Sequence, residues 1–478
     1  MNTPPSISIR LEELYKVLSN HEKSGLARFL NSPYFNRNEN LLLLHRYLAR
    51  TDFESNPPDK SSAWKAVFKT TVYNDKKFRY LVSDLIGAIE EFIFVSSVLK
   101  SKQGYLHLLD EYFTVREAPA NKSSLAEKIK SGKKTKRITI SPEYFLEKHY
   151  ELELLEELHM NSFKQYSRFV KENIKSEPTG LDVFYLIEKL RQLCLVANNN
   201  NVFGVNVKSY RQNEILETAL RSPFKTNPFI RAYHSVYLML ARKEERDYFI
   251  LKKLLDDYGY DFEDKNLAEL FIYARNFCIG KINAGQNNFF AEIFDLYEQG
   301  LSKRVLLLNG EINERNYKNI VTTGLRIGKH QWVFDFINEY RYKLNKLVRE
   351  NSFNYNLANY FFHTGKYDKA LQNLQKVSLS DLFYGLDARM LMLKSYFELD
   401  EQEAFLNAYY SFRVFVMRRK NVSEQHRRNY LNFLRIAKKL MNLRPRDKKN
   451  VLKIQNEIKT QNALADKSWL EEKMKVFA

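Results

Sequence analysis

Apolar residues recur every three or four positions along most of this sequence, with polar residues between them. The segment ENLLLLHRYLAR, in which Leu41, Leu44 and Leu48 share this spacing, is one example. Such a period places apolar side chains on one face of an α-helix. Glycine and proline, which interrupt helices, number only 15 and 11 among 478 residues. The pattern predicts an all-α protein with long helices and short turns.

The first part of the chain is predicted to form a bundle of helices over residues 7–116. Pro33 and the pair Pro57 and Pro58 mark breaks between its helices. The apolar residues at helical spacing are expected to form its core: Phe29, Leu30, Phe35, Leu41, Leu44 and Leu48.

Helix starts and turns can be placed further along the chain. Ser141 precedes Pro142 and Asn227 precedes Pro228, so each pair supplies a capping side chain followed by a residue suited to a first helical turn. The asparagine run 198–201 and Gly204 after it predict a turn. Alternating helical segments and short turns then continue to about residue 445, which is typical of stacked αα-hairpins.

The clearest repeat is residues 354–381, NYNLANYFFHTGKYDKALQNLQKVSLSD. It resembles a tetratricopeptide repeat (TPR) in its first-helix positions, its turn and its second-helix positions, and the small Ala370 would let the two helices approach closely. The matching residues are Leu357, Ala358 and Phe361, then Gly365 and Tyr367, then Ala370, Leu374 and Val377.

Two further units flank this repeat. Residues 388–412 carry Leu391 and Tyr396, and Ala404 lies 34 positions after Ala370, but no turn glycine is present. The preceding unit, NYKNIVTTGLRIGKHQWVFDFINEY, has Gly328 at its turn and Val333 in place of the small alanine. The family's terminal proline is replaced by Leu382 after the best unit.

The helical pattern of residues 7–116 and this resemblance together predict an N-terminal helical bundle followed by a TPR-like αα-hairpin solenoid. The expected domains are a helical domain (1–116), a basic polar linker (117–141), a TPR-like repeat domain (142–445) and a C-terminal capping helix (446–478).

The net charge of +19 is concentrated in two segments. Residues 122–137 hold seven cations and one glutamate, and are expected to be an exposed linker. Residues 413–449 hold thirteen cations against Glu424 and Asp447. A helix beginning after Ser423 would separate an apolar face from a cationic face. The apolar face holds Tyr430, Phe433, Leu434, Ala437, Leu440 and Met441, and the cationic face holds Arg427, Arg428, Arg435, Lys438 and Lys439.

Catalytic motifs are absent from the sequence. The glycines at 280 and 285 have the spacing of a phosphate-binding loop, but Gln286 and Asn287 stand where that loop needs Lys and Ser or Thr. Cys194 and Cys278 lie in apolar contexts and are expected to be buried core residues. We therefore expect no enzyme, no metal and no cofactor, although an active site assembled from residues distant in sequence stays open as an alternative.

Membrane and export signals are also absent. No apolar run approaches the roughly 18 residues of a membrane span, and the first residues lack a basic and an apolar region. The expectation is no membrane association and a cytoplasmic location.

The TPR resemblance implies that a peptide or partner helix binds on a concave surface, making the protein a non-enzymatic scaffold or adaptor. Asn amides and cations there would suit an acidic or C-terminal peptide. The inward positions are Lys318, Asn319, Thr322, Arg326, Tyr355, Asn356, Asn359, His363 and Arg389. An ordinary polar inner face is the alternative for these residues.

Two other functions stay open. RNA or the ribosome could bind the cationic residues between Arg427 and Lys439, which could equally be a solvated outer face. The N-terminal helical domain could also be an effector controlled by a peptide held on the repeats, an arrangement known in bacterial peptide sensors.

Overall fold

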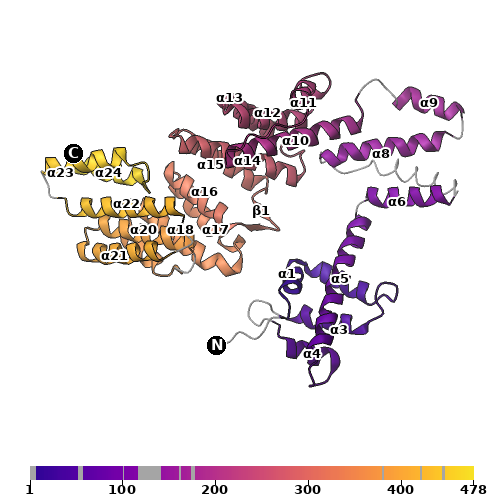
Figure 1. Ribbon diagram of the computed structural model, residues 1–478, viewed down its shortest axis with the longest axis horizontal. Coiled ribbons are helices and arrows are strands. Elements are labelled where there is room, and N and C mark those ends of the chain that lie inside the picture. The colour runs from indigo at the N-terminus through magenta and orange to yellow at the C-terminus, as the bar shows by residue number, and fades with distance from the viewer. Residues whose placement is uncertain are drawn as a thin grey trace. The chain divides into compact units, whose positions relative to one another are not determined.

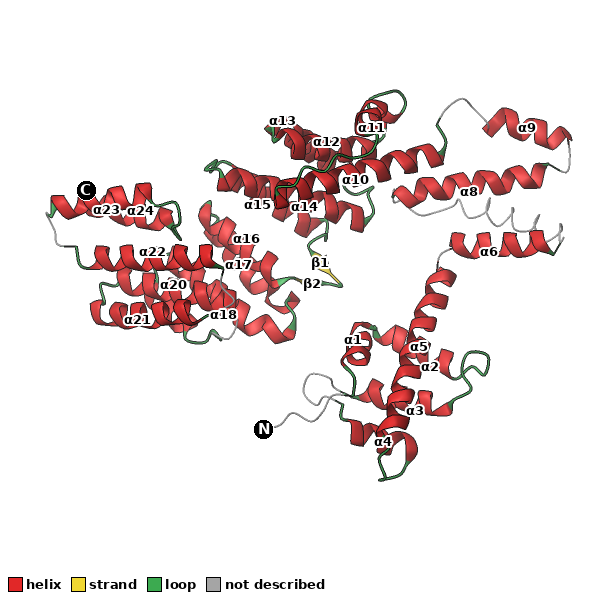
Figure 2. Cartoon of the chain, viewed as in Figure 1, coloured by secondary structure: helices red, strands yellow, loops and turns green. Residues whose placement is uncertain are grey.

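The computed structural model describes residues 7–51, 58–100, 102–116, 141–160, 163–173, 178–378, 382–419, 423–443 and 447–477. Helices make up nearly all of these ranges, which confirms the all-α class (Figure 2). The strands present in them are β1 (Leu307–Leu308) and β2 (Glu311–Ile312), which pair antiparallel. None of the described helices is long and apolar enough to cross a membrane. The linker predicted at 117–141 lies outside the described residues except for Ser141.

The chain divides into two compact units. Unit 1 comprises Met1–Thr135 and Glu147–Ser176, and unit 2 comprises Lys136–Leu146 and Glu177–Ala478. Helix α8 (Pro142–His159) carries residues of both. The other helices of unit 1 are α1 (Ile9–Val17), α2 (Asn20–Leu30), α3 (Glu39–Arg50), α4 (Lys60–Phe68), α5 (Asp75–Lys100), α6 (Lys102–Val115) and α9 (Phe163–Asn173).

The core of unit 1 lies between α1, α2, α3, α4 and α5. It includes the residues expected from the spacing: Phe29, Leu30, Leu41, Leu44 and Leu48 are buried, and Phe35 packs against them. Amphipathic helices of this kind hide their apolar stripes against one another, which is the main source of their stability in a folded protein.

Unit 2 is built from consecutive helices that pack on their sequence neighbours. In Figure 1 the later ones lie side by side, from α18 to α22. The first helices are α10 (Gly180–Phe203), α11 (Gln212–Ala219), α12 (Pro228–Arg242), α13 (Glu245–Tyr258), α14 (Asp264–Asn283), α15 (Phe289–Ser302), α16 (Glu314–Arg326) and α17 (His330–Tyr340). They are followed by α18 (Lys346–His363), α19 (Tyr367–Leu374), α20 (Leu382–Glu398), α21 (Gln402–Arg418), α22 (Glu424–Met441), α23 (Lys448–Thr460) and α24 (Lys467–Phe477). Single 3₁₀ turns occur at Phe224–Thr226 and Arg341–Lys343.

Alternate helices of unit 2 form one layer. α12 packs on α13 and also on α14, α16 packs on α17 and α18, and α18 packs on α19 and α20. Each first helix of a pair therefore contacts both its own partner and the first helix of a neighbouring pair. The helix starts predicted at Pro142 and Pro228 are confirmed, since the side chains of Ser141 and Asn227 accept backbone hydrogen bonds of 3.0–3.2 Å there.

Four helix pairs of unit 2 each have the same type of helix-ending turn between their two helices, at Gly285, Gly328, Gly365 and Asp400. Each of these residues has a positive φ, between 56° and 89°. In each turn the next N–H donates to the carbonyl five residues earlier, as Lys366 does to Phe361 at 2.8 Å. This is the Schellman motif, which favours glycine because a Cβ is strained at positive φ, and which Asp tolerates better than most residues.

The turn at Asp400 corrects the predicted register of the third unit. Val333, Ala370 and Phe405 each lie five residues after their turn, and all three are fully buried. Ala404 is partly exposed instead, so the equivalent of Ala370 is Phe405, 35 residues later. An aspartate at the turn carries no glycine signal, and this is why the spacing of 34 was wrong.

Gly324 of α16 explains how Val333 fits at the place of the small alanine. A Cβ on Gly324 would lie 2.5 Å from Cγ2 of Val333 and 2.9 Å from Cε2 of Phe294. In this unit the facing helix supplies the small residue, so the two helices still approach closely.

The turn predicted at residues 198–201 is wrong, because α10 continues through them to Phe203. Hydrogen bonds of the asparagine side chains stabilise the helix at this point. The Asn200 side-chain amide exchanges hydrogen bonds with the Val207 backbone, and the Asn201 side chain donates to the Leu240 carbonyl at 2.9 Å. The helix ends instead at Gly204, whose φ is 66°.

Candidate binding surface

The four equivalent turns define one face of the helices that precede them. Residues placed 10, 6 and 2 positions before each turn residue share a spacing of four, so they lie on one side of each helix. We call this set the inner stripe. It comprises Arg275, Ile279 and Asn283 on α14; Lys318, Thr322 and Arg326 on α16; Tyr355, Asn359 and His363 on α18; and Met390, Lys394 and Glu398 on α20.

Residues of the stripe contact the neighbouring helices of the layer. The Lys318 ammonium of α16 lies 5.4 Å from the centre of the Tyr355 ring of α18. Lys394 of α20 lies 4.6 Å from the centre of the Phe362 ring of α18. At the other end, the Arg275 guanidinium of α14 donates to Asn316 Oδ1 of α16 at 3.3 Å.

Three ion pairs connect alternate helices of this layer across the helix between them. Arg191 of α10 pairs with Glu269 of α14 at 3.0 Å, and the Tyr233 hydroxyl of the intervening α12 donates to the same carboxylate at 3.1 Å. Lys318 of α16 pairs with Asp387 of α20. The third pair joins Lys394 of α20 to Asp466, which directly precedes α24, at 2.6 Å. We call these three ion pairs the clasps.

The stripe is closed toward its C-terminal end. Tyr355, Asn359 and Lys394 are buried. Glu398 accepts a hydrogen bond from Trp469 Nε1 at 2.9 Å and pairs with Lys473 at 2.7 Å. Helix α24 therefore covers the part of the stripe that lies on α20.

Toward α14 the stripe is open. Ile279, Asn283, Thr322, Arg326 and His363 are exposed. Ile279 and Asn283 also line a cavity of about 800 Å³, together with amide side chains from α10 and α14 that include Asn198 and Asn276.

His363 lies on the open part of the stripe. Its side chain is exposed, yet the surrounding protein desolvates it and, with the Lys394 charge, lowers its pKa to about 4. Besides Lys394, His330 and Arg326 lower this pKa, whereas the Asp466 charge raises it, so charges of both signs act on His363.

Six of the predicted peptide-binding residues lie on the stripe: Lys318, Thr322, Arg326, Tyr355, Asn359 and His363. Of these, Tyr355 and Asn359 are buried and Lys318 is held in its clasp. Asn319 lies beside the stripe, where it is exposed and hydrogen-bonds the Tyr297 hydroxyl.

Two of the predicted residues are not on this surface. Asn356 is fully buried and donates to the Ser352 carbonyl at 2.8 Å. Arg389 stacks on Phe415 at 3.9 Å and donates to the Gly385 carbonyl. The one-residue shift at Asp400 is the reason for the second error, because it puts Met390 at the place expected for Arg389.

Arg275 was not predicted from the sequence as a residue of the binding surface. It stands 10 residues before Gly285, as Lys318 does before Gly328. When Gly285 is interpreted as part of an incomplete phosphate-binding loop, the equivalence of Arg275 and Lys318 is not apparent. When Gly285 is interpreted as a helix-ending glycine, the equivalence follows from the spacing.

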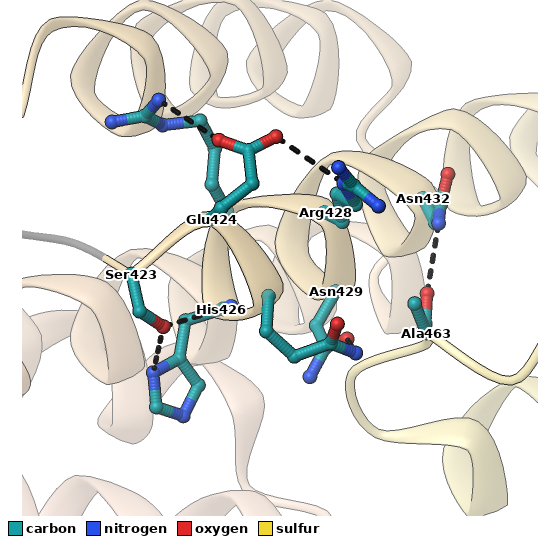
Figure 3. A network of polar contacts seen from close by, with 9 residues as sticks. Ser423, Glu424, His426, Arg428, Asn429, Asn432 and Ala463 are labelled. Atoms are coloured by element: carbon teal, nitrogen blue, oxygen red, sulfur yellow. Dashed lines mark hydrogen bonds and ion pairs between the residues drawn. The ribbon is translucent and has the colours of Figure 1, made fainter.

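The five predicted nucleic-acid-binding cations lie on α22, and two acids of the chain pair with four of them. Figure 3 shows Glu424 between two arginines, with Ser423 capping the helix as predicted. Glu424 pairs with Arg427 at 3.4 Å and with Arg428 at 3.2 Å, while Glu457 pairs with Arg435 at 3.0 Å and with Lys439 at 2.6 Å. The fifth cation, Lys438, donates to the Tyr410 hydroxyl at 3.0 Å.

No cluster of His, Cys, Asp or Glu within the described ranges could hold a metal ion. Cys194 and Cys278 are free and buried, and burial raises the pKa of both thiols. Both therefore lack the properties of a reactive cysteine. No protein-family model and no curated protein matches this sequence.

Proposed function

We propose that this protein is a non-enzymatic scaffold or adaptor that binds an acidic peptide or partner helix on the open part of the inner stripe. The observation that carries the proposal is the exposed Arg326, which lies one helical turn after the exposed Thr322 on α16. In the part of the chain that the structure describes, no carboxylate pairs with Arg326, whose guanidinium lies 5.7 Å from the Phe290 ring centre. Arginine with neighbouring amides and hydroxyls suits carboxylates and peptide backbone.

The TPR resemblance supports the same function. Proteins built from stacked helix pairs present extended surfaces along the first helix of each pair. Four turns of the same type, at Gly285, Gly328, Gly365 and Asp400, agree with such a repeat.

The ion pairs of α22 favour this function over RNA or ribosome binding. A cation that already pairs with Glu424 or Glu457 gains less from a phosphate than a free one does, because its existing pair must break or be shared. The free thiols of Cys194 and Cys278 suit a reducing compartment, and we propose the cytoplasm as the location.

The proposal can be tested by photocrosslinking in the cells that make the protein. A photoreactive phenylalanine analogue would replace the exposed Thr322 in one variant and the exposed Arg231 of α12 in a control. We expect a protein to crosslink at 322 and not at 231, and Arg326→Glu to remove this crosslink. Equal labelling at both positions, or labelling that Arg326→Glu leaves unchanged, would contradict the proposal.

A further inference from the structure

Arg275 differs from the three basic residues of this layer that form the clasps. Arg191 and Lys318 each reach an acid on a helix two positions along the layer, and Lys394 reaches Asp466 directly before α24; these three pairs are the clasps. Arg275 of α14 has no such acid in the described part of the chain. The helix two positions along from α14 is α18, which would have to supply it.

The sequence of α18 explains the missing acid. Asp387 lies 13 residues before the turn residue Asp400, and the residue 13 before Gly365 is Ser352. Ser352 is fully buried and hydrogen-bonded to the Tyr384 hydroxyl at 3.2 Å. A neutral residue thus occupies the place from which a carboxylate closes the neighbouring clasp.

The surroundings of Arg275 are polar but uncharged. Its Nη1 donates to Asn316 Oδ1 at 3.3 Å, and its Nε donates weakly to the Phe271 carbonyl at 3.4 Å. The guanidinium lies 5.6 Å from the Tyr297 ring centre, and Tyr297 in turn is hydrogen-bonded to the exposed Asn319. The side chain is only partly exposed, and its Nη2 has no hydrogen-bond partner among the described residues.

An arginine in this state is electrostatically costly to the fold. Burial lowers the pKa of Arg275, and no nearby carboxylate compensates for the lost hydration. Leaving a partly buried charge without a counterion destabilises a protein, whereas a bound anion would remove this penalty.

We infer that Arg275 receives a carboxylate of the ligand, which completes an intermolecular clasp between α14 and the bound segment. This inference rests on the proposed function, because the carboxylate belongs to the acidic peptide or partner helix on the open stripe. The Nη2 atom donates to the carboxylate, and Asn319 and Thr322 lie beside the path that the segment then follows along α16. Arg326 holds a second acidic group or the backbone further along the same helix.

Binding of immobilised octapeptides tests this assignment. A library that varies the number of Asp and Glu residues would be probed with the full chain, with Arg275→Gln, with Arg326→Glu and with the control Arg231→Gln. We expect retention to rise with the number of carboxylates. Arg275→Gln should weaken binding about 10- to 100-fold, the loss expected for one charge-assisted hydrogen bond, and the control should bind like the unaltered chain.

Matched peptides identify the source of the carboxylate. If amidation of the C-terminus removes the sensitivity to Arg275→Gln, a terminal carboxylate is the group bound; if Gln in place of Glu removes it, a side chain is. Either result supports the assignment. If peptides bind to the unaltered chain and to Arg275→Gln equally, but not to Arg326→Glu, the assignment of Arg275 is overturned. The proposed function would still stand in that case. Absence of any retained peptide would contradict both.

Thermal unfolding provides a check that needs no ligand. Arg275→Met should unfold at the same temperature as the unaltered chain or a higher one, because it removes an unpaired, partly buried charge. A clear drop in unfolding temperature would show that Arg275 serves the fold and would overturn the assignment.

Discussion

The Lys394 ammonium and the Asp466 carboxylate are 72 positions apart in the sequence and form an ion pair of 2.6 Å. Burial alone would raise the pKa of Asp466, but the charge and hydrogen bond of Lys394, with the Trp469 N–H and the Ser468 hydroxyl, hold it below its usual value. This pair ties the start of α24 to the middle of α20. The last helix thereby becomes part of the surface that closes the inner stripe.

Asp466→Asn is expected to destabilise this contact strongly. It leaves the Lys394 ammonium, a buried charge, without its counterion, which typically costs about 3–5 kcal/mol. Thermal unfolding and hydrogen exchange in α24 would measure the loss. The double change with Lys394→Met should recover part of the stability, since no unpaired charge then remains.

A surface pair serves as the control for this change. Glu350→Gln breaks the ion pair with Arg341, in which the Glu350 side chain is 63% exposed. This change should lower the free energy of unfolding by no more than about 1 kcal/mol. If both changes have the same small effect, α24 does not depend on the clasp.

Acidification should weaken unit 1 through His45. Burial and the Arg46 charge lower the pKa of this histidine to about 4, although a hydrogen bond to the Lys23 backbone opposes them, and its Nδ1 lies 2.7 Å from the Tyr15 hydroxyl oxygen. The folded unit therefore keeps His45 neutral, while the unfolded chain takes up a proton near pH 6.5. The stability from this group is complete above pH 6.5, falls as the pH drops toward 4, and amounts to about 3 kcal/mol in total.

Hydrogen exchange measured separately for peptides of α1 and α3 at pH 7 and pH 5 would test this pH dependence. After correction for intrinsic rates, protection should fall at pH 5 in the unaltered chain and change less in His45→Gln. The same loss of protection in both proteins would exclude His45 as its cause.

Two glycines of unit 2 should respond in opposite directions to substitution by alanine. Gly324→Ala forces a Cβ to within 2.5 Å of Val333 and should cost about 1–3 kcal/mol by overpacking. Gly280→Ala meets no atom within 4 Å inside α14 and should stabilise by about 0.5–1 kcal/mol. Urea unfolding of both variants measures the difference. A neutral Gly324→Ala would show that α16 and α17 are not closely packed there.

The sequence sufficed for features that depend on local spacing. The apolar period located the core of unit 1, and Ser423 and Asn227 identified helix starts, because capping is decided within a few residues. It failed where the signal was not local. Asp400 gives no glycine signal, so the register slipped, and the Lys394–Asp466 pair depends on helices brought together only by folding.

The cations of α22 should contribute little to any salt-dependent affinity of the protein for RNA. Five free phosphate contacts would give a log-log salt slope of about −3.5 to −4.5. Because Glu424 and Glu457 already pair with four of these residues, we expect a much shallower slope. Replacing Arg427, Arg428 and Arg435 together by Gln should leave it unchanged. A slope near −4 that this triple change flattens would instead establish α22 as a nucleic-acid surface.

Affinity purification of the intact protein from its own cells, with and without nuclease, tests the central claim most directly. The unaltered chain, Arg326→Glu and the control Arg231→Glu would be compared by mass spectrometry of the recovered proteins. Our account predicts a protein partner that survives nuclease, is lost in Arg326→Glu and is retained in Arg231→Glu. Recovery of RNA or ribosomal subunits that nuclease abolishes and Arg326→Glu leaves intact would contradict it.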